Sequence, residues 1–142
     1  LNKGYDFCCS NYIKIDKVGN FIKEIKDIEF VDSKSILKSN VIPNSSAVYN
    51  VDRLGKFFQK KVGHEDYLMW LIMFKSNPSI IGYRVQESLM FYRVHSENIS
   101  RSKFKTFRWT WNIYYNELNY SFFNSINYFT SYVYGSVKKH FL

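Results

Sequence analysis

Two adjacent acids, Glu65 and Asp66, open a segment that is otherwise apolar almost without interruption through Lys75. A helix that is apolar on every face is a buried one, so its body belongs in the core while its first turn reaches the surface. The helix dipole stabilises carboxylates at this end. A carboxylate on such a rigid support suits a general base that takes a proton from an acceptor hydroxyl. The structural alternative is that acids are the ordinary choice for a first helical turn.

A second group of candidate residues lies where an expected strand ends, after Val94. His95 follows directly, and Arg93 and Arg101 flank it. A metal needs several ligands, and the other candidate ligands near His95 are acids far away in the sequence. The two guanidinium groups could bind a diphosphate. The alternatives are a histidine that merely ends a strand and arginines that are solvated charges.

The segment from Lys103 to Leu142 holds 14 aromatic residues, five Lys or Arg and one acid, Glu117. Its apolar residues recur at helical spacing in two runs that residues 119–121 separate. Such helices can lie in a membrane interface, pack an aromatic face against the domain, or stack nucleic-acid bases. Nucleic acid is disfavoured, because only Lys138 and Lys139 supply cations to the second run, which is too few for a strong phosphate-binding surface.

The bulk properties predict one compact domain. The chain has 142 residues, 46% of them hydrophobic, with a formal net charge of +8 that favours an anionic partner. Cys8 and Cys9 are adjacent, a poor geometry for a disulfide, which indicates reduced thiols in a cytoplasmic protein. The sequence contains no run of about 18 apolar residues, so no segment is expected to span a membrane. The first residue is not Met, and we expect the chain to be part of a longer protein.

The pattern of apolar and polar residues predicts a mixed α/β fold. A strand from Tyr5 to Ile15, a Gly-Asn turn and a partner strand from Phe21 to Phe30 are expected to form a hairpin. Asp32 or Ser33 is expected to cap a short helix through Leu37. The other expected elements are a short strand at 45–49, a turn and short helix within 52–61, a helix at 65–75, one or two strands within 80–94, and two helices after residue 101.

The order of these pieces resembles the second half of GT-A-type family 2 glycosyltransferases, which build bacterial surface polysaccharides. The resemblance covers nearly the whole chain and rests on three motifs followed by the Lys- and aromatic-rich tail. The motifs are Asn-x-Ile-x-x-Ser-Ser (Asn40, Ile42, Ser45, Ser46), Glu-Asp-Tyr-x-x-Trp (Glu65, Asp66, Tyr67, Trp70) and Tyr-Arg-Val-His-x-x-Asn-x-Ser (Tyr92, Arg93, Val94, His95, Asn98, Ser100). The resemblance implies that residues 1–101 form the acceptor-side half of a GT-A nucleotide-diphospho-sugar transferase domain and that residues 102–142 form a helical tail.

On the acceptor side, the resemblance implies that Asp66 is the catalytic base and Glu65 a supporting acid. Ser45 and Ser46 would line the acceptor cleft, and Trp70 would be a packing residue that fixes the helix. The partners implied are a nucleotide sugar and a saccharide acceptor. The basic and aromatic tail adds a further expected partner, the anionic inner face of the cell membrane, bound through residues 103–142. The expected location is cytoplasmic and peripheral to that membrane.

On the donor side, the resemblance implies that His95 joins the shell of a Mg²⁺ or Mn²⁺ ion, with Arg93 and Arg101 facing the donor diphosphate. One departure from the family is serious: these 142 residues contain no Asp-x-Asp motif. We therefore expect that this chain alone neither binds a nucleotide sugar tightly nor turns over. The competing hypothesis is a non-catalytic basic and aromatic module that binds an anionic membrane or nucleic acid.

Overall fold

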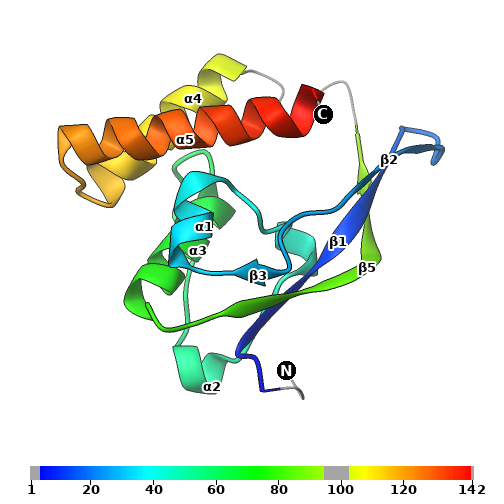
Figure 1. The fold of residues 1–142 in the computed structure, drawn as a ribbon, viewed down its shortest axis with the longest axis horizontal. Coiled ribbons are helices and arrows are strands. Elements are labelled where there is room, and N and C mark those ends of the chain that lie inside the picture. Colours follow the sequence, from blue (N-terminus) through cyan, green and yellow to red (C-terminus); the bar gives the residue numbers. More distant parts are fainter. Residues whose placement is uncertain (1–3, 95–102, 142) are drawn as a thin grey trace.

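A long strand, β1 (Phe7–Ile15), forms the centre of the sheet in a computed structural model that describes residues 4–94 and 103–141 (Figure 1). It turns into β2 (Phe21–Ile25), and the two strands pair antiparallel as the sequence predicts. Asp16 shapes the turn, because its Oδ1 accepts the backbone N–H groups of Val18 and Asn20 at 2.9 and 2.8 Å. The partner strand is shorter than expected, ending at Ile25. Cys8 and Cys9 lie next to each other on β1 and form no disulfide.

A second long strand, β5 (Gly82–Arg93), pairs parallel with β1 and completes the middle of the sheet. Two short strands are added at the start of the long ones. β3 (Phe30–Val31) pairs antiparallel with β5, and β4 (Val48–Tyr49) pairs antiparallel with β1. The strand order along the main path is β2-β1-β5-β3. The fold is therefore mixed α/β, as the sequence predicts.

Parallel strands need a long crossover, and α3 (Glu65–Ser76) lies within this one. Seven of its residues are buried, which confirms the expected core helix: Tyr67, Leu68, Met69, Trp70, Leu71, Met73 and Phe74. Trp70 is a packing residue, as the resemblance implies, since its ring lies edge-on to Phe7 of β1 at 5.5 Å between centroids.

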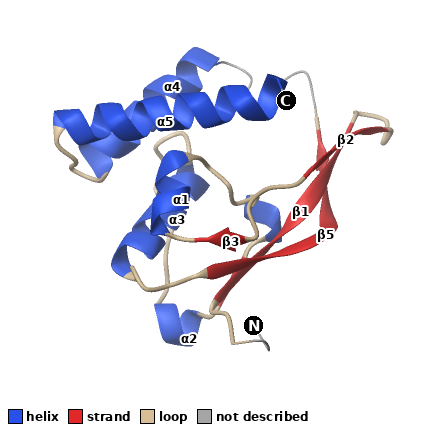
Figure 2. Cartoon of the chain, in the orientation of Figure 1, coloured by secondary structure: helices blue, strands red, loops and turns tan. Residues whose placement is uncertain are grey.

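The remaining short elements lie along the crossover. α1 (Ser33–Lys38) has Asp32 as its N-cap, where a reciprocal capping box with Ser35 satisfies two backbone N–H groups. η1 (Asn44–Ser46) is a single 3₁₀ turn, so the strand expected at 45–49 is wrong in its first half. α2 (Val51–Leu54) follows β4. Figures 1 and 2 show α1 and α3 together on one side of the sheet.

The tail forms two helical segments, as predicted. α4 (Lys103–Asn112) runs into the π-helical turn η3 (Ile113–Glu117), and α5 (Phe122–Phe141) returns across the ends of α1 and α3 (Figure 1). Among the described residues, no helix is long and apolar enough to cross a membrane.

Two buried tyrosines join this tail to the rest of the core. The Tyr67 hydroxyl donates to the carbonyl of Ile36 at 2.8 Å, and the Tyr114 hydroxyl donates to that of Leu37 at 2.7 Å. The two hydroxyl oxygens lie 2.7 Å apart. The last carbonyls of a helix have no partner within it, so the tyrosines satisfy the end of α1 while they hold α3 and η3 beside it.

Arg84 is the most deeply buried charged residue described, with 1% of its surface exposed. Its Nε donates to the carbonyl of Ile28 and its Nη1 to that of Ser10, both at 2.9 Å, while its Nη2 donates to that of Val41. A buried charge is tolerated where its donors are occupied, and here three backbone segments occupy them.

We predict that Arg84→Met lowers the free energy of unfolding by about 3 kcal/mol or more, because each buried carbonyl that loses its donor costs about 1–3 kcal/mol. Urea unfolding followed by circular dichroism measures this change. Arg53→Met is the matched control. Arg53 forms an exposed ion pair with Asp6 at 3.0 Å, and its loss should cost less than about 1 kcal/mol. Equal costs for the two variants would contradict the role assigned to Arg84.

Candidate functional site

The N-terminal end of α3, called the α3 head below, carries the candidate base Asp66. Gly63 precedes this head in the chain, and Trp109 of the tail packs against that glycine. Gly63 has a φ of +107°, and a Cβ there would lie 2.3 Å from Cδ2 of Trp109 in α4. The Trp109 ring also meets the His64 ring edge-on at 5.4 Å. Only glycine fits this position, because both its backbone conformation and the adjacent indole exclude a side chain.

The two acids at this head differ in how they are held. Oε1 of Glu65 accepts the backbone N–H of Gly63 at 3.2 Å, so this carboxylate closes the turn before the helix. Asp66 forms no side-chain hydrogen bond to any residue that the structure describes. Both acids are half-buried. Both oxygens of Asp66 are therefore without such a bond, whereas one oxygen of Glu65 is engaged in the turn.

The carboxylates at the α3 head affect the pKa values of two neighbouring residues, His64 and Tyr132. Burial lowers the pKa of His64, and the negative charges of Asp66 and Glu65 oppose that shift only in part, which favours a neutral imidazole near pH 7. Burial raises the pKa of the Tyr132 hydroxyl, and the charge of Asp66 adds to the shift. Tyr132 comes from α5 and packs against Tyr67, so the tail lies beside Asp66.

The serines expected at the acceptor cleft lie on η1. Ser46 Oγ accepts the backbone N–H of Ser10 at 3.2 Å and donates to the carbonyl of Pro43 at 3.0 Å. These bonds fix η1 against β1. Ser45 is exposed and faces solvent. The structure thus gives Ser46 an anchoring role and leaves Ser45 open to contact a ligand.

The residues expected at the donor diphosphate lie at the end of β5 or outside the described chain. Arg93 Nη1 donates to the carbonyls of Asp16 and Lys17 at 3.3 and 3.0 Å, so it supports the β1–β2 turn. His95 and Arg101 lie outside the described residues. Within residues 4–94 and 103–141, no three His, Cys, Asp or Glu side chains gather where they could hold a metal ion.

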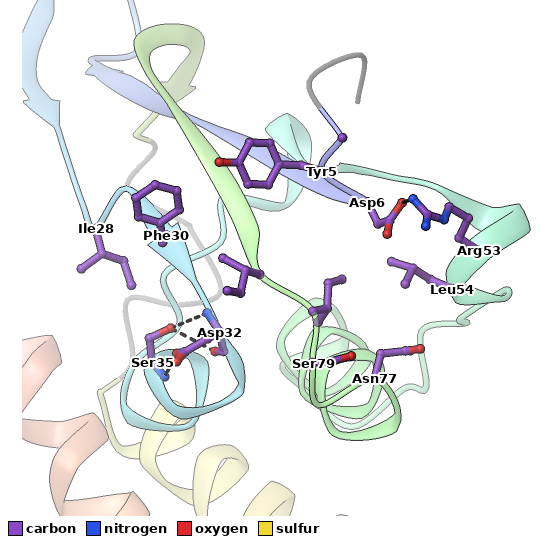
Figure 3. A pocket seen from close by; sticks show the side chains of 13 residues that line it. Tyr5, Asp6, Ile28, Phe30, Asp32, Ser35, Arg53, Leu54, Asn77 and Ser79 are labelled. Atoms are coloured by element: carbon purple, nitrogen blue, oxygen red, sulfur yellow. Dashed lines mark hydrogen bonds and ion pairs between the residues drawn. The ribbon is translucent and has the colours of Figure 1, made fainter.

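A broad cavity of about 1070 Å³ opens at the other end of α3 (Figure 3). Its wall combines Tyr5, Phe30 and the Asp6–Arg53 ion pair with residues after α3, and the capping-box residue Asp32 lies beside them. It includes neither acid of the α3 head. A helix of 12 residues spans about 18 Å, so this cavity and the candidate base are separate features.

Trp109 and Tyr132 are the site residues that the sequence does not single out. Helical spacing predicts that aromatic residues of the tail form a core face, but it does not say which element that face covers. The structure places these two rings against the α3 head.

Comparison with known proteins gives one informative match. The chain is 29% identical over 130 residues, or 92% of its length, to a protein of Haemophilus influenzae (strain ATCC 51907 / DSM 11121 / KW20 / Rd) named as an uncharacterized glycosyltransferase. The chain spans about half of that relative, 52% of its length. No family model and no solved structure matches. The chain is therefore similar, over nearly all its residues, to a part of a protein that is named a glycosyltransferase.

We predict that Gly63→Ala is more destabilising than Gly55→Ala. Both glycines have positive φ, +107° and +87°, but a Cβ at Gly55 meets open space, whereas one at Gly63 strikes Trp109. The extra cost at Gly63 should be about 1–3 kcal/mol, the usual cost of overpacking. Urea unfolding measures both variants. Adding Trp109→Ala to Gly63→Ala should recover part of the loss, and a purely additive double variant would contradict the contact.

The lowered pKa of His64 predicts a pH-dependent stability. As the pH falls below about 6.5, the unfolded chain protonates this histidine before the folded chain does, so the free energy of unfolding decreases until the folded pKa is passed. His64→Phe keeps a ring against Trp109 and removes the titration. Its stability should fall less than that of the wild type on acidification. Parallel stability curves for the two proteins would refute this expectation.

Proposed function

We propose that this chain forms the acceptor-side part of a glycosyltransferase of the GT-A type, family 2. The enzyme would transfer a sugar from a nucleotide-sugar donor to a saccharide acceptor during synthesis of a cell-surface polysaccharide or lipopolysaccharide. The similarity to the Haemophilus influenzae protein supports glycosyl transfer in general. The motif order described above supports the finer assignment. We also propose that it works at the cytoplasmic face of the cell membrane.

The position of Asp66 is the observation that carries the proposal. Its carboxylate has no hydrogen bond to a described residue, at the head of a helix whose other turns are buried. Trp70 fixes that helix by edge-on contacts with Phe7 and Tyr49. During transfer, the acceptor hydroxyl loses a proton as its oxygen attacks the anomeric carbon and the nucleoside diphosphate leaves. Asp66 would take that proton, with Glu65 holding the turn before it.

The donor side requires groups beyond the described residues. We propose that Arg93 and Arg101 face the donor diphosphate, that His95 joins the shell of the metal ion, and that Ser45 contacts the acceptor. The Mg²⁺ or Mn²⁺ ion that the resemblance implies finds no set of three ligands among the described residues. We propose that a donor-binding part outside this chain completes the enzyme, and that the chain alone does not turn over.

A chimaera tests the proposal: this chain replaces the matching part of the Haemophilus influenzae relative. Release of nucleoside diphosphate from a panel of nucleotide sugars, with saccharide acceptors present, reports transfer. We expect Asp66→Asn to lower the rate about 10²–10⁴-fold, the contribution of a general base.

Asp52→Asn is the matched control, because Asp52 also lies in a first helical turn and is exposed. It should leave the rate unchanged, and the chain alone should release no diphosphate. Equal rates for Asp66→Asn and the unmodified chimaera would exclude Asp66 as the base. An inactive chimaera beside an active native relative would argue against a shared function.

A further inference from the structure

The outer face of α5 presents an uncharged stripe to solvent. The exposed residues Phe123, Ile126, Thr130, Tyr134 and Val137 follow one another at intervals of three or four, which places them on one side of the helix. Phe123 is 82% exposed and Tyr134 is 72% exposed. No charged residue occurs between Phe122 and Val137. The water-facing side of a helix normally carries charged and polar residues, so this stripe is suited to another environment.

An aromatic cluster extends the stripe at the turn between η3 and α5. The Trp111 ring stacks on Tyr115 at 5.8 Å between centroids and meets Phe122 edge-on at 5.9 Å, and Phe122 meets Phe123 edge-on at 6.0 Å. Tyr115, Phe122 and Phe123 are exposed. Trp and Tyr, with an apolar body and a polar tip, are enriched where lipid headgroups meet acyl chains.

The charged residues beside this surface indicate which kind of partner it fits. Lys105 and Arg108 are exposed on α4, on the same side of that helix as the exposed Phe104. Glu117 is the one acid in the described residues from 103 to 141, and Lys60 neutralises it through a contact of 2.6 Å. The surface is therefore apolar and cationic, with its acid already paired. Anionic lipid complements both properties at once.

We propose that α4 and α5 form a docking surface for an anionic lipid bilayer, on which the helices lie parallel to the membrane plane. Phe123, Tyr134 and the aromatic cluster would enter the headgroup region, and Lys105 and Arg108 would meet the lipid phosphates. Figure 2 shows the two helices together at one end of the molecule, with the sheet on the other side of α1 and α3. The inference is independent of the transferase activity, because it rests on the exposed face of the tail alone.

Co-sedimentation with vesicles tests the proposal on the full chain. We expect binding to vesicles of phosphatidylcholine mixed with phosphatidylglycerol, weaker binding to phosphatidylcholine alone, and a decrease as salt is added. Phe123→Ser combined with Tyr134→Ser should weaken binding at least about tenfold, since two exposed aromatic rings no longer enter the lipid. Lys105→Gln combined with Arg108→Gln should weaken it about tenfold or more on the anionic vesicles only.

Phe58→Ser is the matched control. Phe58 is 80% exposed but belongs to the loop between α2 and α3 and not to the tail helices, and its loss should leave vesicle binding unchanged. All five positions are exposed, so the variants should keep the wild-type circular dichroism and unfolding curve. Wild-type protein that does not sediment with anionic vesicles would overturn the proposal. A dimer in sedimentation equilibrium that Phe123→Ser with Tyr134→Ser dissolves, without vesicle binding, would assign the face to a second copy and overturn it equally.

Discussion

The guanidinium of Arg84 donates to carbonyls from three segments that are distant in the sequence, at Ser10, Ile28 and Val41. Because a buried cation is tolerated only with its donors occupied, these carbonyls must remain in place together. One side chain of β5 thereby fixes β1, the connection between β2 and β3, and the loop between α1 and η1. The backbone N–H of Arg84 adds a bond to the carbonyl of Glu29 at 2.7 Å. The parallel pair of β1 and β5, and the crossover that contains α3, depend on this arrangement.

Contacts with the domain that Arg84 holds together, and contacts with the tail, fix the position of the α3 head. Tyr67 and Tyr114 tie α3 and η3 to the last carbonyls of α1, and Trp109 closes over Gly63. The head is thus held from both sides, by the domain and by α4. Although its neighbours are held by these contacts, the Asp66 carboxylate accepts no hydrogen bond from a described residue. A proton acceptor on a rigid support needs this combination of a fixed backbone and a free oxygen.

Local patterns predicted the elements whose formation depends on nearby residues. The apolar run after Glu65 and Asp66 identified α3, the Gly-Asn turn identified the hairpin, and Asp32 identified the cap of α1. Contacts between distant segments were not predictable. The Ser46 hydroxyl accepts the backbone N–H of Ser10, and no residue near Ser46 in the sequence predicts that partner. β3 has two residues and exists only because β5 offers it an edge, so it carries no periodicity of its own.

Arg84 shows most clearly which contacts the sequence alone could not predict. An alternating strand with tyrosine and valine around an arginine suggests that the arginine faces water, whereas Gly82 and Arg84 are the buried positions. The strand can bury its charge only because three unrelated segments bring carbonyls to it, and no single window of sequence contains them. The same reasoning applies to Trp109 and Tyr132. Helical spacing predicts an aromatic face on the tail without singling out these two residues. Their packing against the α3 head depends on Tyr67 and Gly63, which lie far from the tail in the sequence.

The two faces of the α4–α5 pair connect the two proposals. The inner face contacts the α3 head through Trp109 and Tyr132, and the outer face carries the uncharged stripe. An α-helix with its side chains is about 10–12 Å across, so a bilayer docked on the stripe would lie roughly one helix diameter from Asp66. A saccharide acceptor carried at the membrane surface would then lie about that distance from the candidate base. The geometry makes membrane docking and acceptor chemistry compatible in one orientation of the molecule, because both depend on the same pair of helices.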